Sequence, residues 1–189
     1  MILGLVLFLG VHTLTTQRKL RARLIASAGE GGYKIGYALV SLAGLALIVW
    51  GFAHYRATGW IDVWYPPRWL KHIAVALMLP AIILVVAAYI RGRIYTVIKH
   101  PMLSGVKLWA AAHLIANGDL GGIILFGSFL GWAVFDRISL KRRTDAAAPP
   151  IPVGGPTNDL IAIAVGIVAY LALVFAFHPV VIGVPVVGG

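Results

Sequence analysis

The chain has no cysteine and few acidic residues. The missing thiols exclude disulfides, thiolate-bound zinc, iron–sulfur clusters and cysteine nucleophiles. Charged residues make up only 12% of the 189 positions, where a soluble domain has roughly 25%. In contrast, 60% of the residues are hydrophobic and the mean hydropathy is +0.92. A soluble globule of this size could not bury so much apolar surface, so the composition indicates a polytopic membrane protein.

Six apolar segments predict an all-α bundle of about six transmembrane helices. They cover approximately residues 2–16, 35–53, 73–90, 102–116, 120–138 and 160–177. The residues at their ends agree with these divisions, because Pro101 suits the first turn of a helix and Asp159 is placed to cap the sixth. Pro80 falls inside the third segment, where a membrane helix tolerates it as a kink.

Basic residues are concentrated in alternate loops. The first, third and fifth loops hold Arg18, Lys19, Arg21, Arg23, Lys34, Arg91, Arg93, Lys99, Arg137, Lys141, Arg142 and Arg143. The second loop holds only Arg56, Arg68 and Lys71, and the fourth holds none. The positive-inside rule therefore predicts that the odd loops are cytoplasmic and that both termini lie outside. The net charge of +10 is then explained by anionic lipid headgroups, and nucleic-acid binding is not expected.

The chain is expected to divide into three parts. Residues 1–143 would form a five-helix membrane domain, and residues 159–189 would add a sixth helix with a short outer tail. Between them, residues 144–158 are rich in Pro, Gly and Ala without a helical period, which is typical of a linker.

Two of the six histidines lie within apolar segments. His12 and His113 are each surrounded by apolar residues, and an ionisable side chain at bilayer depth is a functional candidate. Neutral imidazole is also a common axial ligand of haem iron. The other four lie at the ends of segments, and of these His54 and His178 are interpreted as ordinary interfacial residues, whereas His72 and His100 stay open.

The depths of His12 and His113 permit a pair without requiring one. At the rise of an α-helix, His12 lies roughly 15 Å from the outer face and His113 about 5 Å from the outer end of its segment. From the residues alone, three interpretations stay open: a bis-histidine haem, a structural or proton-relay pair, and another metal. A lone metal ion would need a third ligand, and none is evident.

Small residues beside these histidines are compatible with a large planar ligand. Ala110 and Ala112 adjoin His113, Trp109 shares its helical face, and Gly10 lies near the other histidine. The alternative is that the small residues only allow helices to pack closely.

Two sequence stretches carry a resemblance to a known family. They are Lys-His-Pro-Met-Leu-Ser-Gly at 99–105 and Trp-Ala-Ala-Ala-His-Leu-Ile-Ala-Asn-Gly-Asp at 109–119. Together with His12, His54, His72 and Asp136-Arg137, they resemble the NnrU family over about residues 1–143. That family of bacterial inner-membrane proteins is associated with denitrification, where it supports nitrite and nitric oxide reduction. It is related to 15-cis-ζ-carotene isomerase, which carries haem b.

The resemblance implies a haem b cofactor. His12 and His113 match the two axial ligands of the isomerase, and Trp109, His100, His72 and His54 are implied as further residues at the cofactor. His100, next to Pro101, would shape the start of its helix and hydrogen-bond a haem propionate or a residue behind a ligand. The isomerase has a cysteine where this chain has Ala110, so a cysteine ligand switch is impossible here.

The His-Pro-x-x-x-Gly stretch is also similar to the isoprenylcysteine methyltransferase group. Lys99 and Leu103 stand where those enzymes have Arg and Tyr, so the first half of their cofactor motif is approximate. Their acidic, aromatic C-terminal segment has no counterpart, since only Asp145 and Asp159 follow residue 143. Methyl transfer is therefore not expected.

Three functions follow as expectations. The first is a haem b redox or accessory protein of the inner membrane that supports nitrite and nitric oxide reduction, with a membrane redox partner or a nitrogen-oxide reductase. The second is a haem-dependent cis–trans isomerase of a polyene. The third is a scaffold or maturation factor without haem. Whether the chain is an enzyme stays open.

Overall fold

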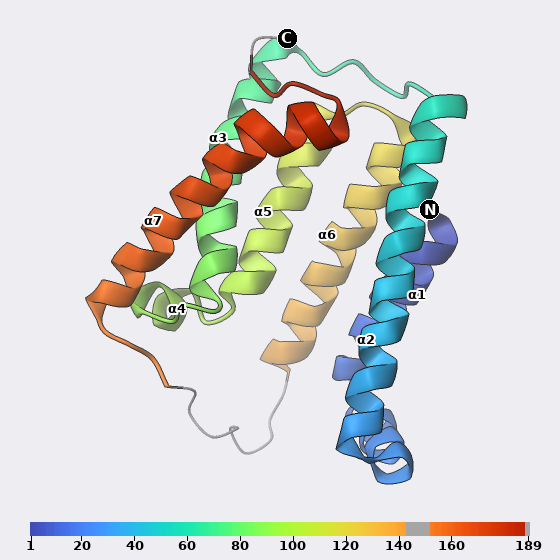
Figure 1. Ribbon diagram of the computed structural model, residues 1–189, viewed down its shortest axis with the longest axis vertical. Helices are drawn as coiled ribbons and strands as arrows, with labels where there is room; N and C mark the ends of the chain where they lie inside the picture. The colour runs from blue at the N-terminus through green and yellow to red at the C-terminus, as the bar shows by residue number, and fades with distance from the viewer. Residues whose placement is uncertain (143–151, 188–189) are drawn as a thin grey trace. The chain divides into compact units, whose positions relative to one another are not determined.

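The computed structural model describes residues 1–142 and 152–187, and it confirms the all-α class. Its elements are α1 (Ile2–Thr13), the 3-10 turn η1 (Leu14–Thr16), α2 (Arg18–Thr58), α3 (Arg68–Ala87), α4 (Arg93–Ile98), α5 (Pro101–Ala116), α6 (Leu120–Lys141), α7 (Pro156–Ala172) and the π-helix η2 (Leu173–Ile182) (Figure 1). Within residues 1–142 and 152–187 there is no strand, although Asp62 and Asp119 form an isolated β-bridge.

Four of these helices are long and apolar enough to cross a membrane. They are α2, α3, α6 and the continuous helix Pro156–Ile182 formed by α7 and η2. The other two expected spans are helical but shorter, since α5 has 16 residues and α1 has 12. The membrane character is therefore supported, whereas the count of about six spans is not confirmed within the described residues.

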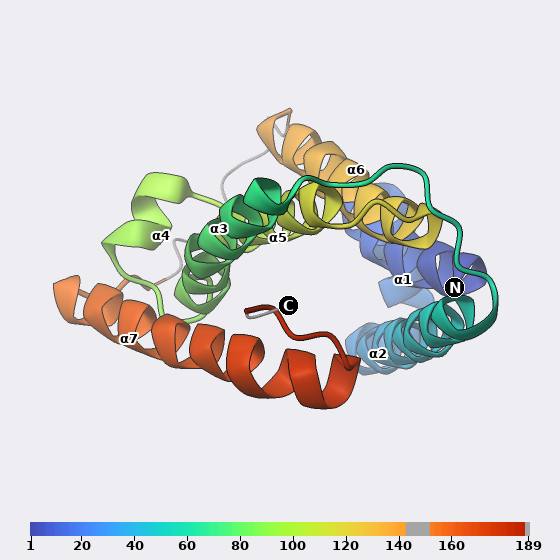
Figure 2. The same cartoon turned by 90° about the horizontal axis from the view of Figure 1, so that it is seen from above.

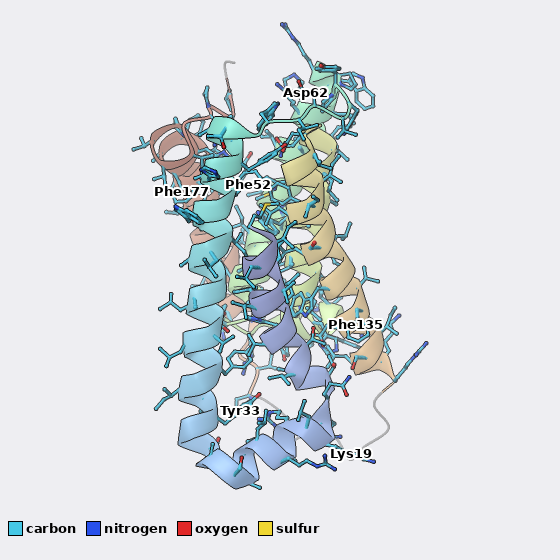
Figure 3. The ribbon with its side chains drawn as sticks, turned by 90° about the vertical axis from the view of Figure 1, so that its right-hand side faces the viewer. Lys19, Tyr33, Phe52, Asp62, Phe135 and Phe177 are labelled. Atoms are coloured by element: carbon cyan, nitrogen blue, oxygen red, sulfur yellow. The ribbon has the colours of Figure 1, made fainter. Side chains whose placement is uncertain are left out.

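Helix α2 extends far beyond the expected second span. Its 41 residues include positions 18–34, which we expected to be a loop. That stretch is rich in Ala, Leu and Arg, which are strong helix formers, and this outweighs its charge. Gly29 interrupts the helix with φ 73° and ψ 164°, a conformation that glycine adopts without the steric cost of a Cβ. The segment before Gly29 turns away from the rest of α2, close to Tyr33 (Figure 3).

The helices form two compact units, each described here by itself. The first unit contains α1, α2 and α6, and the second contains α3, α4, α5 and α7. The expected division at residues 143 and 159 stays a prediction. Of the expected linker 144–158, residues 144–151 lie outside the described residues, and residues 152–155 have no regular secondary structure before α7 begins at Pro156.

In the first unit, two glycines let α1 and α2 touch through their backbones. A Cβ on Gly4 would lie 2.6 Å from the backbone nitrogen of Ile48, and a Cβ on Gly44 would lie 2.8 Å from that of Phe8. Such distances leave no room for any side chain. Helix α1 lies beside α2 (Figure 3), and His12 of α1 faces Tyr37 of α2 with 5.3 Å between their ring centres.

The loop after α2 is fastened to the start of α6. The backbone N–H groups of Val63 and Trp64 both donate to the carbonyl of Gly118, at 2.8 and 3.0 Å. Asp119 is buried and caps α6 by accepting a hydrogen bond of 2.7 Å from the backbone N–H of Gly122. The aromatic second loop therefore belongs to the first unit up to Tyr65.

In the second unit, α3 contacts both α5 and α7 (Figure 2). Small residues again set the close approach: a Cβ on Gly105 would lie 2.7 Å from the carbonyl oxygen of Ala81, and one on Gly166 would lie 2.7 Å from Cγ1 of Ile83. The Tyr170 hydroxyl donates to the carbonyl of Val75 at 3.2 Å.

One expected helix cap is wrong. Asp159 does not cap its own helix, because Gly155 is the N-cap of α7 and makes no side-chain hydrogen bond there. The Asp159 carboxylate instead accepts hydrogen bonds from Arg93 and Ile94, at the start of α4. The sequence could not show that this carboxylate lies beside a helix start so far away in the chain. Pro101 is at the start of α5 as expected.

Candidate functional site: histidines in two helical units

His12 is held in one orientation by its own helix. Its Nδ1 lies 2.6 Å from the carbonyl oxygen of Phe8, one turn earlier on α1. A carbonyl only accepts, so Nδ1 carries the proton in this geometry and Nε2 carries the lone pair. The ring stacks on Phe8 at 4.2 Å, lies 5.3 Å from Tyr37, and meets Trp132 edge-on at 5.8 Å, all between ring centres.

Polar atoms that lack hydrogen bonds occur on Trp132 and on residues one helical turn away from Tyr37 and Trp132. Tyr33 Oη, Trp132 Nε1 and Asp136 Oδ1 are buried and make no hydrogen bond to the residues that the structure describes. Tyr33 lies 6.2 Å from Tyr37, ring centre to ring centre. Such atoms are uncommon in native interiors and point to a polar role. We name His12, Tyr33, Tyr37, Trp132 and Asp136 the His12 cluster.

Of the His12 cluster, only His12 was predicted from the sequence as a site residue. Asp136 entered only as part of a family pattern. The signal for the rest was the spacing of four residues in Tyr33/Tyr37 and Trp132/Asp136, which places each pair on one helical face. That spacing is also common in ordinary helix packing. It indicates a cluster only in the folded structure, where His12 of α1 contacts both Tyr37 of α2 and Trp132 of α6.

His113 has the same local geometry in the second unit. Its Nδ1 lies 2.8 Å from the carbonyl oxygen of Trp109, one turn earlier on α5, which again leaves the lone pair on Nε2. The rings of His113 and Trp109 are 5.4 Å apart. Ala110 and Ala112 are 0% and 1% exposed. Both alanines are therefore fully buried, and their expected place beside a planar ligand stays a prediction.

A histidine that we had interpreted as interfacial lies beside His113. The ring centres of His113 and His178 are 6.2 Å apart, with 31° between the ring planes. His178 lies in the π-helical stretch η2 that continues α7. It follows Ala162, Gly166, Tyr170 and Val174 at intervals of four residues. This four-residue spacing was visible in the sequence, but only the packing of the helices showed that it brings His178 next to His113.

The remaining predicted site residues are spread over both units. His54, in the first unit, is exposed and stacks on Trp50 at 5.9 Å. In the second unit, His72 is exposed near the start of α3, and His100 is the N-cap residue of α5. His100 and Pro101 thus occupy the N-cap and the first turn of α5. Each unit holds one of the two expected ligands, so the structure describes His12 and His113 separately.

Metal binding is limited by the ligands present. Within residues 1–142 and 152–187, no three His, Asp or Glu side chains gather as a metal site would require. A bare metal ion therefore lacks a donor set there. Haem iron needs only one or two protein ligands, and imidazoles with a carbonyl-bound Nδ1 fit that need, because such a bond fixes the ring and raises the basicity of the ligating nitrogen.

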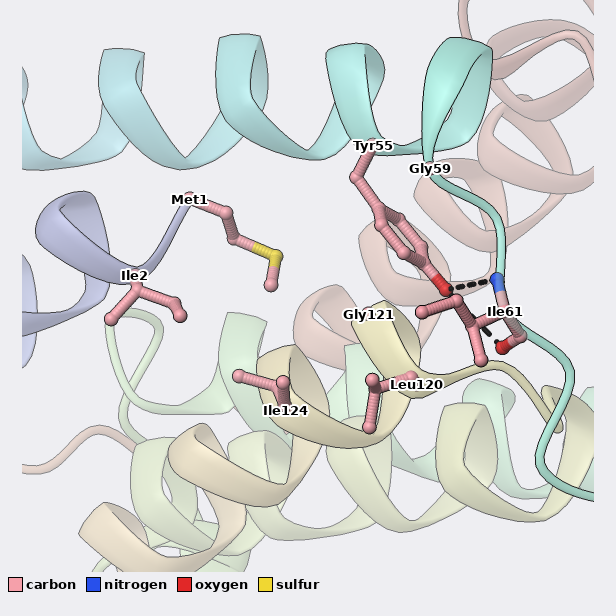
Figure 4. A pocket seen from close by; sticks show the side chains of 8 residues that line it. All are labelled: Met1, Ile2, Tyr55, Gly59, Ile61, Leu120, Gly121 and Ile124. Carbon is pink, nitrogen blue, oxygen red and sulfur yellow. Dashed lines mark hydrogen bonds between the residues drawn. The ribbon is translucent and has the colours of Figure 1, made fainter.

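A separate pocket of about 460 Å³ lies in the first unit (Figure 4). Its walls are apolar except at Tyr55, whose hydroxyl accepts a hydrogen bond of 3.1 Å from the backbone N–H of Ile61. Met1 and Ile2 line it, so it lies at the opposite end of α1 from His12. It has no histidine or acid in its lining and is separate from the His12 cluster.

Comparison with protein families decides the identity. A family model described as NnrU protein matches residues 1–186. The chain belongs to the NnrU family. The NnrU match extends beyond the 1–143 that the resemblance covered, so it includes α7 and His178. No curated protein and no solved structure gave a significant match to the chain.

Proposed function

We propose that this NnrU-family protein binds haem b and supports nitrite and nitric oxide reduction as a redox or accessory protein. The observation that carries the proposal is the geometry of two histidines in apolar helices. His12 and His113 each direct Nδ1 to the carbonyl of the preceding turn, at 2.6 and 2.8 Å. Both rings are thereby fixed in the tautomer whose Nε2 could bind iron.

The residues of the chain would hold and tune the cofactor. In this proposal His113 would bind the iron, and His12 would be the further ligand that the family resemblance implies. Trp109 supplies the carbonyl that fixes His113, and its ring packs beside the imidazole. His100 is proposed to bond a propionate, while His54 and His72 are exposed and have a peripheral part at most. Haem supplies one-electron chemistry, and two imidazole ligands favour electron transfer over substrate binding at the iron.

The charge distribution supports a location and an orientation. Four apolar helices suit a bilayer, and we propose the bacterial inner membrane with both termini on the periplasmic side. The basic loops then face anionic lipid on the cytoplasmic side. The partner would be a membrane redox protein or a nitrogen-oxide reductase.

An absorption spectrum tests the haem proposal directly. The detergent-purified wild type is expected to show haem b bands in the oxidised and reduced forms, and extraction of the pigment identifies the haem type. His113→Ala should lose most of the pigment, whereas Ser104→Ala on the same helix should retain it. A wild type that is colourless and does not bind added haem would overturn the proposal, and so would unchanged bands in His113→Ala.

A cellular test addresses the denitrification role. Deleting the gene in a denitrifying host should slow consumption of nitrite and nitric oxide, and the wild-type copy should restore it, whereas a His113→Ala copy should not. Normal consumption after deletion would contradict the role. A parallel assay on di-cis-ζ-carotene separates this function from polyene isomerisation, since conversion of that substrate would favour the isomerase instead.

A further inference from the structure

His113 and His178 form a pair of imidazoles inside one compact unit. His113 comes from α5 and His178 from η2, 65 residues later, and the chain between them returns through α6 and α7. Both belong to the second unit, whose packing brings the ring centres to 6.2 Å. Two histidines gathered at this distance from separate apolar helices are costly unless they share a role.

The ring separation matches two ligands on opposite sides of one metal ion. With metal–imidazole bonds of about 2.0–2.1 Å, two rings that bind from opposite sides have centres about 6.3 Å apart, whereas a tetrahedral ion would bring them to about 5.1 Å. The observed 6.2 Å agrees with the first arrangement. Opposite placement is that of the two axial ligands of haem iron.

His178 has an unmet requirement that a metal bond would satisfy. Its Nδ1 is buried and has no hydrogen-bond partner in the part of the chain that the structure describes. Leaving such an atom unpaired is unfavourable, so a buried imidazole nitrogen usually has a partner. For His113, the Nδ1 bond to Trp109 places the lone pair on Nε2. Each ring thus offers one nitrogen suited to a metal.

The backbone around His178 is unusual in a way that is typical of functional positions. Residues Leu173–Ile182 form a π-helix, and Pro179 directly follows the histidine. π-Helical turns are rare in proteins, and those that occur are often found at functional sites. The wider turn continues the packed ridge of Ala162 and Gly166 on α7 and brings His178 to α5.

The surroundings also indicate which metal centre this pair would serve. No third His, Asp or Glu joins such a group within residues 1–142 and 152–187. Two imidazoles alone complete the coordination of iron only when a tetradentate macrocycle supplies the other four bonds.

We propose that His178 is an axial ligand, paired with His113, for the haem iron. This inference rests on the proposed haem function and assigns the iron to a site within the second unit. This assignment replaces His12, the second ligand that the family resemblance implies, with His178 of the same unit as His113. His12 is then only a member of the aromatic, polar His12 cluster of the first unit.

Haem titration of the detergent-purified full chain tests the assignment. The wild type is expected to give the low-spin spectrum of two imidazole ligands. His178→Ala should convert it to a high-spin form and weaken haem retention at least tenfold, whereas His12→Ala should stay low-spin. Phe175→Ala, an exposed neighbour in the same π-helix, is the control for disturbance of η2 and should match the wild type.

Two further measurements separate ligation from a structural role. Free imidazole should restore the low-spin spectrum of His178→Ala, because it can replace the missing ring. His178→Met should keep the haem but raise its reduction potential, as histidine–methionine ligation does. Neither effect is expected from a residue that only supports the fold.

The outcomes distinguish the two proposals. A wild type that binds no haem overturns the proposed function and this inference with it. A wild type that binds haem, together with a low-spin His178→Ala and a high-spin His12→Ala, overturns only the assignment of His178. An His178→Ala protein that is high-spin and is not restored by imidazole also overturns that assignment.

Discussion

Asp159 Oδ2 accepts a hydrogen bond of 2.9 Å from the backbone N–H of Arg93, which lies 66 residues earlier in the chain. Its other carboxylate oxygen accepts from the N–H of Ile94, also at 2.9 Å. Asn158 adds a bond of 2.9 Å from its amide to the carbonyl of Arg91. Residues at the start of α7 therefore supply hydrogen-bond acceptors for the free N–H groups at the start of α4. These bonds join the C-terminal helix to the rest of the second unit.

Removing this cap should destabilise the second unit. Asp159→Ala leaves two helix-start N–H groups without an acceptor, and a lost cap costs about 0.5–2 kcal/mol. We expect a lower unfolding temperature in detergent, measured by a thermal-shift assay. Asp159→Asn should retain most of the stability because its side-chain oxygen still accepts. Thr157 is exposed, so Thr157→Ala serves as the control. An equal loss of thermal stability in that variant would contradict the capping role of Asp159.

The glycine crossing between α1 and α2 should tolerate no side chain. In Gly44→Leu the new Cβ would meet the backbone of Phe8 at 2.8 Å, so α1 must move away and the His12 cluster must open. We expect a loss of about 1–3 kcal/mol or more, as for other overpacked contacts. Gly36→Leu on the same helix meets nothing within 4 Å and should be tolerated. Similar thermal stability of the two variants would show that the helices are not in backbone contact.

The sequence predicted much of the fold, because apolar composition and helix-end residues are local signals. It identified the all-α class, the start of α5 at Pro101 and the two histidines in apolar helices. It missed the helix over residues 18–34, because we gave charge more weight than helix propensity. His178 was interpreted as an interfacial residue, because neither the π-helix nor the contact between His178 and His113 leaves a short-range pattern in the sequence. The acceptor role of Asp159 across 66 residues was hidden for the same reason.

Two aspartates of α6 should respond in opposite ways to alanine. Asp119 caps the helix with a bond of 2.7 Å to Gly122, so Asp119→Ala should cost about 0.5–2 kcal/mol. Asp136 has a buried Oδ1 without a partner among the residues described, so Asp136→Ala removes a desolvated atom and should leave stability unchanged or raise it. Thermal unfolding of both variants provides the measurement. A marked loss in Asp136→Ala would instead reveal an ion or proton that this carboxylate binds.

The cysteine-free sequence allows the proposed orientation to be tested by labelling. Because the natural chain has no thiol, a single Cys can be placed at Lys19, in the basic segment before Gly29, or at Trp60, in the aromatic loop after α2. Both positions are exposed. If the basic segments are cytoplasmic, a membrane-impermeant maleimide applied to intact spheroplasts should label Trp60→Cys and not Lys19→Cys. Both should react after the membrane is permeabilised, which controls for accessibility. Labelling of Lys19→Cys in intact spheroplasts, with Trp60→Cys protected, would reverse the orientation and place the basic segments on the periplasmic side.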